Sequence, residues 1–181
     1  KKSKRKITIV IDPGHGGKDP GTSYPGRFNE KDVVLRFSSL LKKNLQKNPK
    51  YRVFLTREDD SFVPLSQRVE FASTKSADLF ISIHADASRN NNVKGFSVYT
   101  LSEKGIDRES EKLAKREDSL YLISREYKRR GINLKNAKGL KENYLITTAL
   151  KESQLRSTKF AGILVDKVSE RTRLLERPQR Y

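Results

Sequence analysis

Two short apolar runs rich in β-branched residues, each ending at a polar residue, constrain the fold of this chain most strongly. The first spans residues 7–11, within a predicted strand at 6–11 that stops at Asp12-Pro13-Gly14, and the second spans residues 79–83 and ends at His84. Runs of this length and composition are typical of buried strands. Because helical patterns lie between the strand patterns, the sequence predicts an α/β layered fold.

Further elements follow from local signals. Strands are predicted at 51–55 and 96–101, with a loop rich in Gly and Pro at 12–28. A helix is predicted to begin after the N-cap Asn29, since Glu30 and Asp32 suit its first turn, and to end before Asn48-Pro49. The apolar residues expected on its buried face are Val33, Phe37, Leu40, Leu41 and Leu45.

Two more helices complete the expected architecture. A short one is opened by Val63-Pro64-Leu65, and a long one is predicted from Tyr144 to about Leu175. The core candidates on the long helix are Leu145, Leu155, Ile163, Leu164 and Val168.

The size and composition indicate one domain with a solvated appendage. The chain has 181 residues, of which 34% are hydrophobic and 34% are charged. Residues 102–141 are dense in Lys, Arg and Glu, and a helix is predicted there over 108–127. This inserted segment is either a solvated helical excursion or a lid over a functional site.

The formal net charge of +17 favours binding to a polyanion such as nucleic acid, an anionic membrane or an acidic wall polymer. The absence of cysteine excludes disulfides, thiolate metal ligands and cysteine nucleophiles. No transmembrane run and no signal peptide is recognised. Because the chain has no methionine, we expect it to be a processed or trimmed form of a longer protein.

The chain has two histidines, and each follows a predicted strand. Open α/β sheets carry their functional residues at the carboxyl ends of the strands, so His15 and His84 are expected to lie together at one edge of the sheet. A hydrolytic zinc site needs about three protein ligands and one open position. Glu30, in the first turn of the predicted helix, is the candidate third ligand. Taken singly, each histidine is more typical of a polar residue at the end of a strand than of a metal ligand. Glu30, taken singly, is more typical of a carboxylate that stabilises a helix dipole.

Four segments resemble, in order, the zinc-dependent N-acetylmuramoyl-L-alanine amidases of the Amidase_3 type. They are residues 9–17 (IVIDPGHGG), 29–32 (NEKD), 55–57 (LTR) and 82–86 (SIHAD). The similarity runs from about residue 6 to residue 101 and continues more weakly to Tyr181. It implies Zn²⁺ held by His15, Glu30 and His84, in a layered domain around a mostly parallel, roughly six-stranded sheet. The implied reaction hydrolyses the amide between N-acetylmuramic acid and L-alanine of peptidoglycan stem peptides.

The resemblance also implies parts that this chain lacks or alters. The family's general base is a Glu on a late strand, and residues 177–181 resemble the stretch before that strand. We therefore expect the general base to lie beyond Tyr181. The single domain 1–181 is then expected to lack its C-terminal strand. Asp86 is a weak candidate to replace the base. Cell-division amidases of the bacterial envelope insert a helix where this chain has residues 102–141, and Arg116-Glu117-Asp118 resembles its zinc-blocking stretch. Glu117 is thus a candidate autoinhibitory zinc ligand that an activator protein would release from the metal. The alternative is that Glu117 is an ordinary surface residue of a charged helix.

Three functions remain open. The first is a periplasmic amidase acting on peptidoglycan, and the second is a non-catalytic basic zinc-containing module that binds cell-wall polymer. The third is a related zinc peptidase acting on ordinary peptides. Nucleic acid is not an expected partner, because the basic residues are spread along the chain without a recognition motif.

Overall fold

The structure, a computed structural model, describes residues 5–24, 26, 28–86, 88, 90, 92–100 and 140–180. The chain forms two compact units, an N-terminal unit (Lys1–Ala87) and a C-terminal unit (Ser88–Tyr181), and each is described by itself. The predicted lid, including its helix at 108–127 and Glu117, lies outside the described residues as far as residue 139. Of the predicted lid segment, residues 140 and 141 are described, and they form the start of a long helix.

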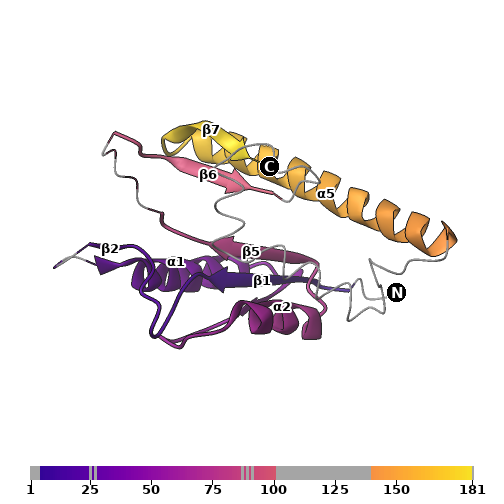
Figure 1. Cartoon of the computed structure of the whole chain (residues 1–181), viewed down its shortest axis with the longest axis horizontal. Helices are drawn as coiled ribbons and strands as arrows, with labels where there is room; N and C mark the ends of the chain where they lie inside the picture. Colours follow the sequence, from indigo (N-terminus) through magenta and orange to yellow (C-terminus); the bar gives the residue numbers. More distant parts are fainter. Residues whose placement is uncertain are drawn as a thin grey trace. The chain divides into compact units, whose positions relative to one another are not determined.

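The N-terminal unit is built on a three-stranded parallel sheet. Its strands are β1 (Ile7–Pro13), β4 (Tyr51–Leu55) and β5 (Leu79–Ile83), in the order β4-β1-β5. The neighbouring strands β1 and β5 are labelled in Figure 1. Ile11 in the central strand lies opposite Leu55 on one side and Ile81 on the other. The predicted strand positions are confirmed, and β1 continues two residues past its predicted end because Asp12 and Pro13 pair with Ser82 and Ile83.

Two helices flank this sheet, α1 (Glu30–Leu45) and α2 (Leu65–Thr74), and α1 packs against β1 and β4. Asn29 is the N-cap of α1 as predicted, but its side chain makes no capping hydrogen bond. Part of the predicted loop before α1 is a short antiparallel hairpin, β2 (Ser23–Tyr24) with β3 (Phe28–Asn29). This hairpin leads the chain directly into the first turn of α1.

The buried face of α1 differs from the predicted one. Val33, Phe37 and Leu40 are 41%, 54% and 52% exposed, whereas the fully buried positions are Glu30, Val34 and Ser38. Both sets follow helical spacing, so periodicity alone selected the more apolar set. The observed buried face begins at Glu30, whose carboxylate lies at the carboxyl ends of β1 and β5. Leu41 and Leu45 do pack on the core as predicted.

The core of the N-terminal unit lies between α1 and the sheet. Its buried members come from the two strands that α1 covers, namely Ile9, Ile11, Val53 and Leu55. Five partly buried apolar residues surround them, namely Leu41, Leu45, Tyr51, Leu79 and Ile83. This packing holds the start of α1 beside the ends of β1 and β5.

The C-terminal unit joins β6 (Phe96–Tyr99), α5 (Leu140–Ser169) and β7 (Leu174–Arg180), and β6 and β7 pair in parallel. The prediction that the long helix reaches Leu175 was wrong. The backbone from Leu174 onward pairs with β6, with Leu174 opposite Phe96 and Arg180 opposite Tyr99. Residues 177–180 therefore lie within a strand, β7.

The packed side of α5 also differs in part. Ala161 and Val165 are buried, Leu164 and Val168 are partly buried, and Leu155 and Ile163 are exposed; the side chain of Leu145 lies outside the description. The buried residues of α5 are small or β-branched and pack close to β6 and β7. The prediction had instead placed mainly large apolar residues on this face. The α/β class, with a mostly parallel sheet flanked by helices, is confirmed.

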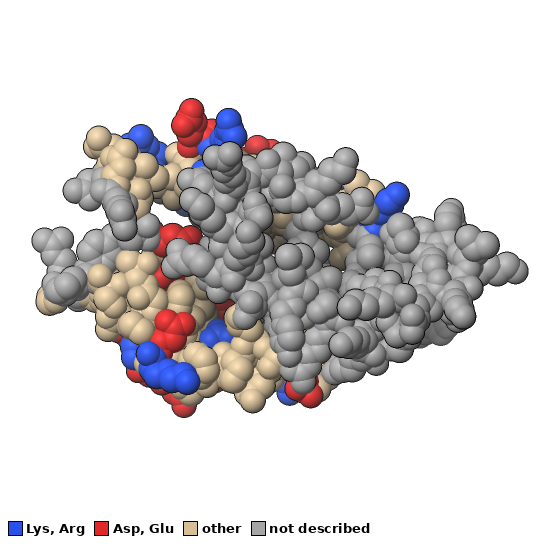
Figure 2. Space-filling view, viewed as in Figure 1, with Lys and Arg blue, Asp and Glu red and all other residues tan. Residues whose placement is uncertain are grey.

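Charged side chains of both signs lie beside one another on the described surface, as the space-filling view shows on one face (Figure 2). Exposed ion pairs in the N-terminal unit join Lys31 to Asp60 and Lys42 to Glu58. Among the described helices, none has the length and apolar character needed to cross a bilayer.

Candidate metal centre

The two histidines are brought together by the pairing of β1 with β5. Pro13 lies opposite Ile83, and the N–H of Gly14 donates to the carbonyl of Ile83 at 3.0 Å. His15 and His84 follow these strand ends, so parallel pairing places them at one edge of the sheet. Their ring centroids are 5.0 Å apart, and the rings are nearly perpendicular at 86°. The predicted placement of both histidines is confirmed.

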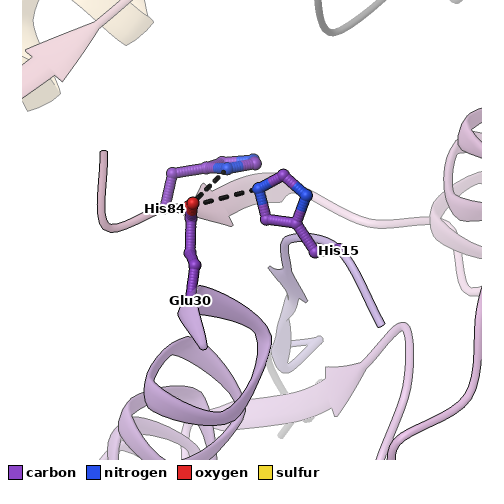
Figure 3. Close-up of side chains that lie close together, drawn as sticks. All are labelled: His15, Glu30 and His84. Atoms are coloured by element: carbon purple, nitrogen blue, oxygen red, sulfur yellow. Dashed lines mark hydrogen bonds and ion pairs between the residues drawn. The ribbon is translucent and has the colours of Figure 1, made fainter. Parts of the chain in front are cut away.

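Glu30 projects from the first turn of α1 between the two imidazoles (Figure 3). Its Oε1 lies 3.2 Å from Nε2 of His15 and 3.2 Å from Nδ1 of His84. The same oxygen accepts the N–H of Ala85 at 2.8 Å, and Oε2 accepts the N–H of Thr22 at 3.0 Å. With only 2% of its surface exposed, Glu30 is a buried anion held by donors from several segments.

The donor set of this cluster fits a zinc ion. The ligand atoms of His15, Glu30 and His84 all lie within 4.8 Å of one another. Tetrahedral ligands about 2.0–2.1 Å from zinc are separated by about 3.3 Å, close to the two distances from Glu30 Oε1. Two imidazoles and one carboxylate are ligands that zinc accepts, and three protein ligands leave a fourth position open.

The cluster shifts the pKa values of its members in opposite directions. Burial disfavours the charged form of Glu30, but hydrogen bonds from His15, His84 and two backbone N–H groups outweigh it and hold its pKa far below its usual range. The hydrogen bond to Glu30 is the main cause that raises the pKa of His15 to about 9; burial opposes this rise, and Asp19 adds to it. In the metal-free protein at neutral pH, His15 therefore carries a proton between two carboxylates.

The apparent zinc affinity of the site is expected to rise with pH, because the metal must displace the proton of His15. The increase should be about tenfold per pH unit between pH 7 and the His15 pKa of about 9, and should level off above it. The raised pKa also means that His15 stabilises the metal-free fold fully below about pH 6.5 and loses this effect as pH rises through about 9. Chelator-competition titrations across this range measure the slope, and a flat profile would contradict the assignment.

Two buried arginines hold the loop that carries His15. Arg68 donates to the carbonyls of Pro13 and His15, both at 2.7 Å, and pairs with the Asp12 carboxylate at 2.9 Å. Arg57 donates to the carbonyl of Gly14 at 2.8 Å and to that of Lys31, beside Glu30, at 2.9 Å. Arg57 thus ties the histidine loop to the start of α1.

These supporting residues were largely missed by sequence reasoning. Arg57 was recognised only as part of a motif, and neither the role of Arg68 nor that of Asp12 was anticipated. One signal existed for Arg68, which occupies the buried face of α2 with Ala72, four residues later. A charged residue at such a position calls for a buried partner.

Gly14 leaves space for the ring of His84. A Cβ at this position would lie 2.7 Å and 2.8 Å from the two ring nitrogens of His84. Any side chain at residue 14 would therefore displace a candidate ligand. Of the other candidates, Asp86 is exposed and is not part of the cluster, and Glu117 lies outside the described residues.

Comparison with known proteins gives a consistent result. The family model described as N-acetylmuramoyl-L-alanine amidase matches residues 9–180. A putative N-acetylmuramoyl-L-alanine amidase of Buchnera aphidicola subsp. Acyrthosiphon pisum is 34% identical over 173 residues, which cover 96% of this chain and 69% of that protein. The N-acetylmuramoyl-L-alanine amidase AmiC of Escherichia coli O6:H1 is 46% identical over 101 residues, 56% of this chain. That match spans only 24% of the length of AmiC.

Solved structures are similar over about half of the chain. An N-acetylmuramoyl-L-alanine amidase from Clostridium difficile 630 aligns with a TM-score of 0.52 and 34% identity, over 55% of each chain. The catalytic domain of CwlV, an amidase of the same type from Bacillus (Paenibacillus) polymyxa, aligns with a TM-score of 0.51 and 37% identity, over 55% of this chain and 56% of that one.

Proposed function

The chain belongs to the N-acetylmuramoyl-L-alanine amidase family, and from this premise we propose that it is the zinc-binding part of a peptidoglycan amidase. The bond cleaved is the amide between N-acetylmuramic acid and L-alanine of the stem peptide. The observation that carries the proposal is the convergence of His15, Glu30 and His84 at one sheet edge within a single compact unit.

The chain's own residues have separate parts in this proposal. His15 presents Nε2 and His84 presents Nδ1 toward the buried Glu30 carboxylate, which supplies the negative charge that favours a divalent cation. When bound, zinc supplies Lewis-acid chemistry, lowering the pKa of water and polarising an amide carbonyl. The general base is proposed to lie on a strand that follows Tyr181, as the family resemblance implies.

A dye-release assay on labelled peptidoglycan tests this function in the full-length protein. We expect release that stops on chelation, returns with zinc, and is absent in His15→Ala. Mass spectrometry of the products should show an intact stem peptide with a free L-alanine amine. Cleavage within ordinary peptides would favour the peptidase instead, and zinc-dependent wall binding without hydrolysis would favour the non-catalytic basic module.

The inserted segment 102–141 is proposed to be an autoinhibitory lid in which Glu117 occupies the open position of the metal. A fourth protein ligand excludes water from the metal, so its removal raises the rate. Full-length Glu117→Ala should therefore hydrolyse peptidoglycan faster than the parent without an activator protein, whereas Glu111→Ala on the same segment should not. Equal rates for Glu117→Ala and parent would remove the lid proposal and leave the metal site standing.

We also propose that the protein acts in the bacterial cell envelope, in the periplasm, where its substrate lies. The net charge of +17 would favour retention on an anionic wall or membrane surface. Retention of this kind weakens as salt rises, because exposed charges are screened.

A further inference from the structure

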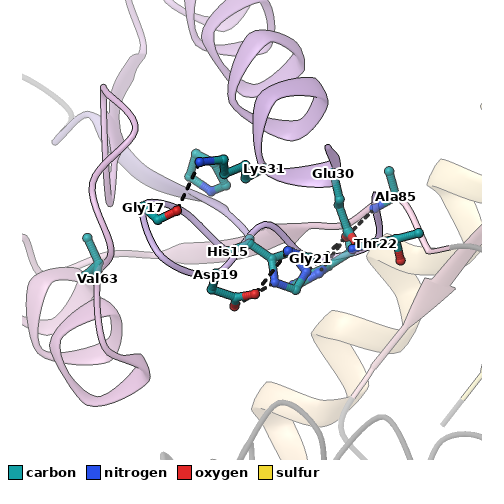
Figure 4. A network of polar contacts seen from close by, with 12 residues as sticks. His15, Gly17, Asp19, Gly21, Thr22, Glu30, Lys31, Val63 and Ala85 are labelled. Atoms are coloured by element: carbon teal, nitrogen blue, oxygen red, sulfur yellow. Dashed lines mark hydrogen bonds and ion pairs between the residues drawn. The ribbon is translucent and has the colours of Figure 1, made fainter. Parts of the chain in front are cut away.

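Asp19 contacts the His15 ring on the side opposite the candidate metal position. Its Oδ2 lies 2.9 Å from Nδ1 of His15, while Nε2 of the same ring lies 3.2 Å from Glu30 Oε1 (Figure 4). The ring is therefore held at both nitrogens, by two carboxylates from different parts of the chain. Asp19 is outside the cluster of candidate ligands.

The Asp19 carboxylate is itself held in place. Its Oδ1 accepts the N–H of Gly21 at 3.0 Å, and its backbone exchanges two hydrogen bonds with Gly16, at 2.9 Å and 3.1 Å. His15 sits in this closed loop with a φ of 60°, a left-handed conformation that a non-glycine residue adopts at some cost. The loop thus fixes both the backbone of His15 and the carboxylate that faces its ring.

The His15 ring is confined on another side by Gly21. A Cβ at Gly21 would lie 2.6 Å from Cδ2 of His15 and 2.8 Å from Oε2 of Glu30. The side chain of His15 is 11% exposed and that of Asp19 is 44% exposed, so the carboxylate borders solvent far more than the ring does. The ring can turn little without losing its contact to Asp19 or to Glu30.

We propose that Asp19 is a positioning residue that accepts the Nδ1–H of His15 and so directs the lone pair of Nε2 toward the metal. A neutral imidazole carries one N–H, and the partner of one nitrogen decides which nitrogen is left to bind a metal. The inference rests on the proposed function, because it concerns how one ligand of the proposed zinc site is oriented. It adds a residue that does not itself contact the metal.

The sharpest variant is Asp19→Asn in the full chain, because it is nearly isosteric and reverses the hydrogen-bonding role. If the amide oxygen keeps the bond from Gly21, the amide nitrogen faces Nδ1 as a donor and favours the N–H on Nε2. We expect zinc affinity, measured by chelator competition, to fall about 10- to 100-fold. Asp19→Ala should lose affinity within the same range, and far-UV circular dichroism should show that both metal-free variants are folded.

Asp60→Ala is the matched control for a general loosening of the loop. Asp60 accepts the N–H of Gly17 in the same loop at 2.8 Å and pairs with Lys31, and it is not a member of the candidate ligand cluster. If Asp19 acts on the imidazole, zinc affinity should fall much less in Asp60→Ala than in Asp19→Asn. An equal loss in both variants would mean that Asp19 only closes the loop, and would overturn the proposal.

A second readout reports the tautomer directly. The chain has two histidines, so long-range ¹H–¹⁵N spectra of the zinc-loaded protein contain two imidazoles, which are assigned through their connections to the backbone resonances. The parent should show His15 protonated at Nδ1, and protonation at Nε2 in the parent would overturn the proposal. Failure of the parent to bind zinc would instead overturn the proposed metal site, so the two failures are distinguishable.

Discussion

Replacing Glu30 by glutamine is expected to reduce zinc affinity by more than the roughly 100-fold that loss of an outer-shell partner costs. Glu30 is the one member of the cluster in contact with both imidazoles, and a neutral amide removes its charge. The metal-free protein should also lose about 1.5–3 kcal/mol of unfolding free energy at pH 7, the contribution typical of hydrogen bonds to a charged group. Chelator competition and urea unfolding measure the two effects.

Glu58→Gln is the control for this experiment, since it makes the same chemical change at an exposed carboxylate that pairs with Lys42. It should leave zinc affinity unchanged. Far-UV circular dichroism establishes that Glu30→Gln is folded before its affinity is compared. If folded Glu30→Gln bound zinc within tenfold of the parent, Glu30 would not be a ligand.

Replacing Arg68 by methionine is expected to destabilise the protein by about 3–5 kcal/mol, because it leaves the Asp12 carboxylate buried without its cation. The two side chains are 4% and 6% exposed, and their atoms lie 2.9 Å apart. Among the described residues, the hydroxyls of Thr56 and Ser82 would remain as side-chain partners of Asp12. Zinc affinity should fall as well, since Arg68 also holds the carbonyl of His15. Urea unfolding of the metal-free protein gives the free energy.

The double variant Asp12→Asn/Arg68→Met separates the buried charge from lost packing. If the unpaired carboxylate is the cause, the double variant should be more stable than Arg68→Met alone. Arg36→Met, at an exposed position on α1, makes the same side-chain change and should shift stability by less than about 0.5 kcal/mol. A cost below about 1 kcal/mol for Arg68→Met would show that the pair does not support the loop.

The three candidate ligands were predictable because each is marked by a local signal. His15 and His84 follow apolar strand patterns, and Glu30 follows a helix N-cap. Parallel pairing of two such strands places their ends at one edge, so the rule for open α/β sheets was enough to join them. The strands at 51–55 and 79–83 were likewise predicted at the bounds that the structure has.

The errors have a common physical cause. The face of α1, the end of α5 and the strand β7 depend on contacts between segments far apart in the chain. Residues 174–180 are a strand because they pair with β6, about 80 residues earlier, and their own periodicity does not show it. The same holds for Arg68, whose carboxylate partner Asp12 lies 56 residues away.

Local patterning therefore sufficed for the α/β class, the positions of the buried strands and the identity of the three candidate metal-ligating side chains. These depend on hydrophobic period and on capping preferences, which act over a few residues. Folding alone established how far each ligand reaches, which nitrogen of each histidine faces Glu30, and which carboxylate and arginines hold them. Those features are set by close packing and by the pairing of buried polar groups, whose partners a one-dimensional pattern does not specify.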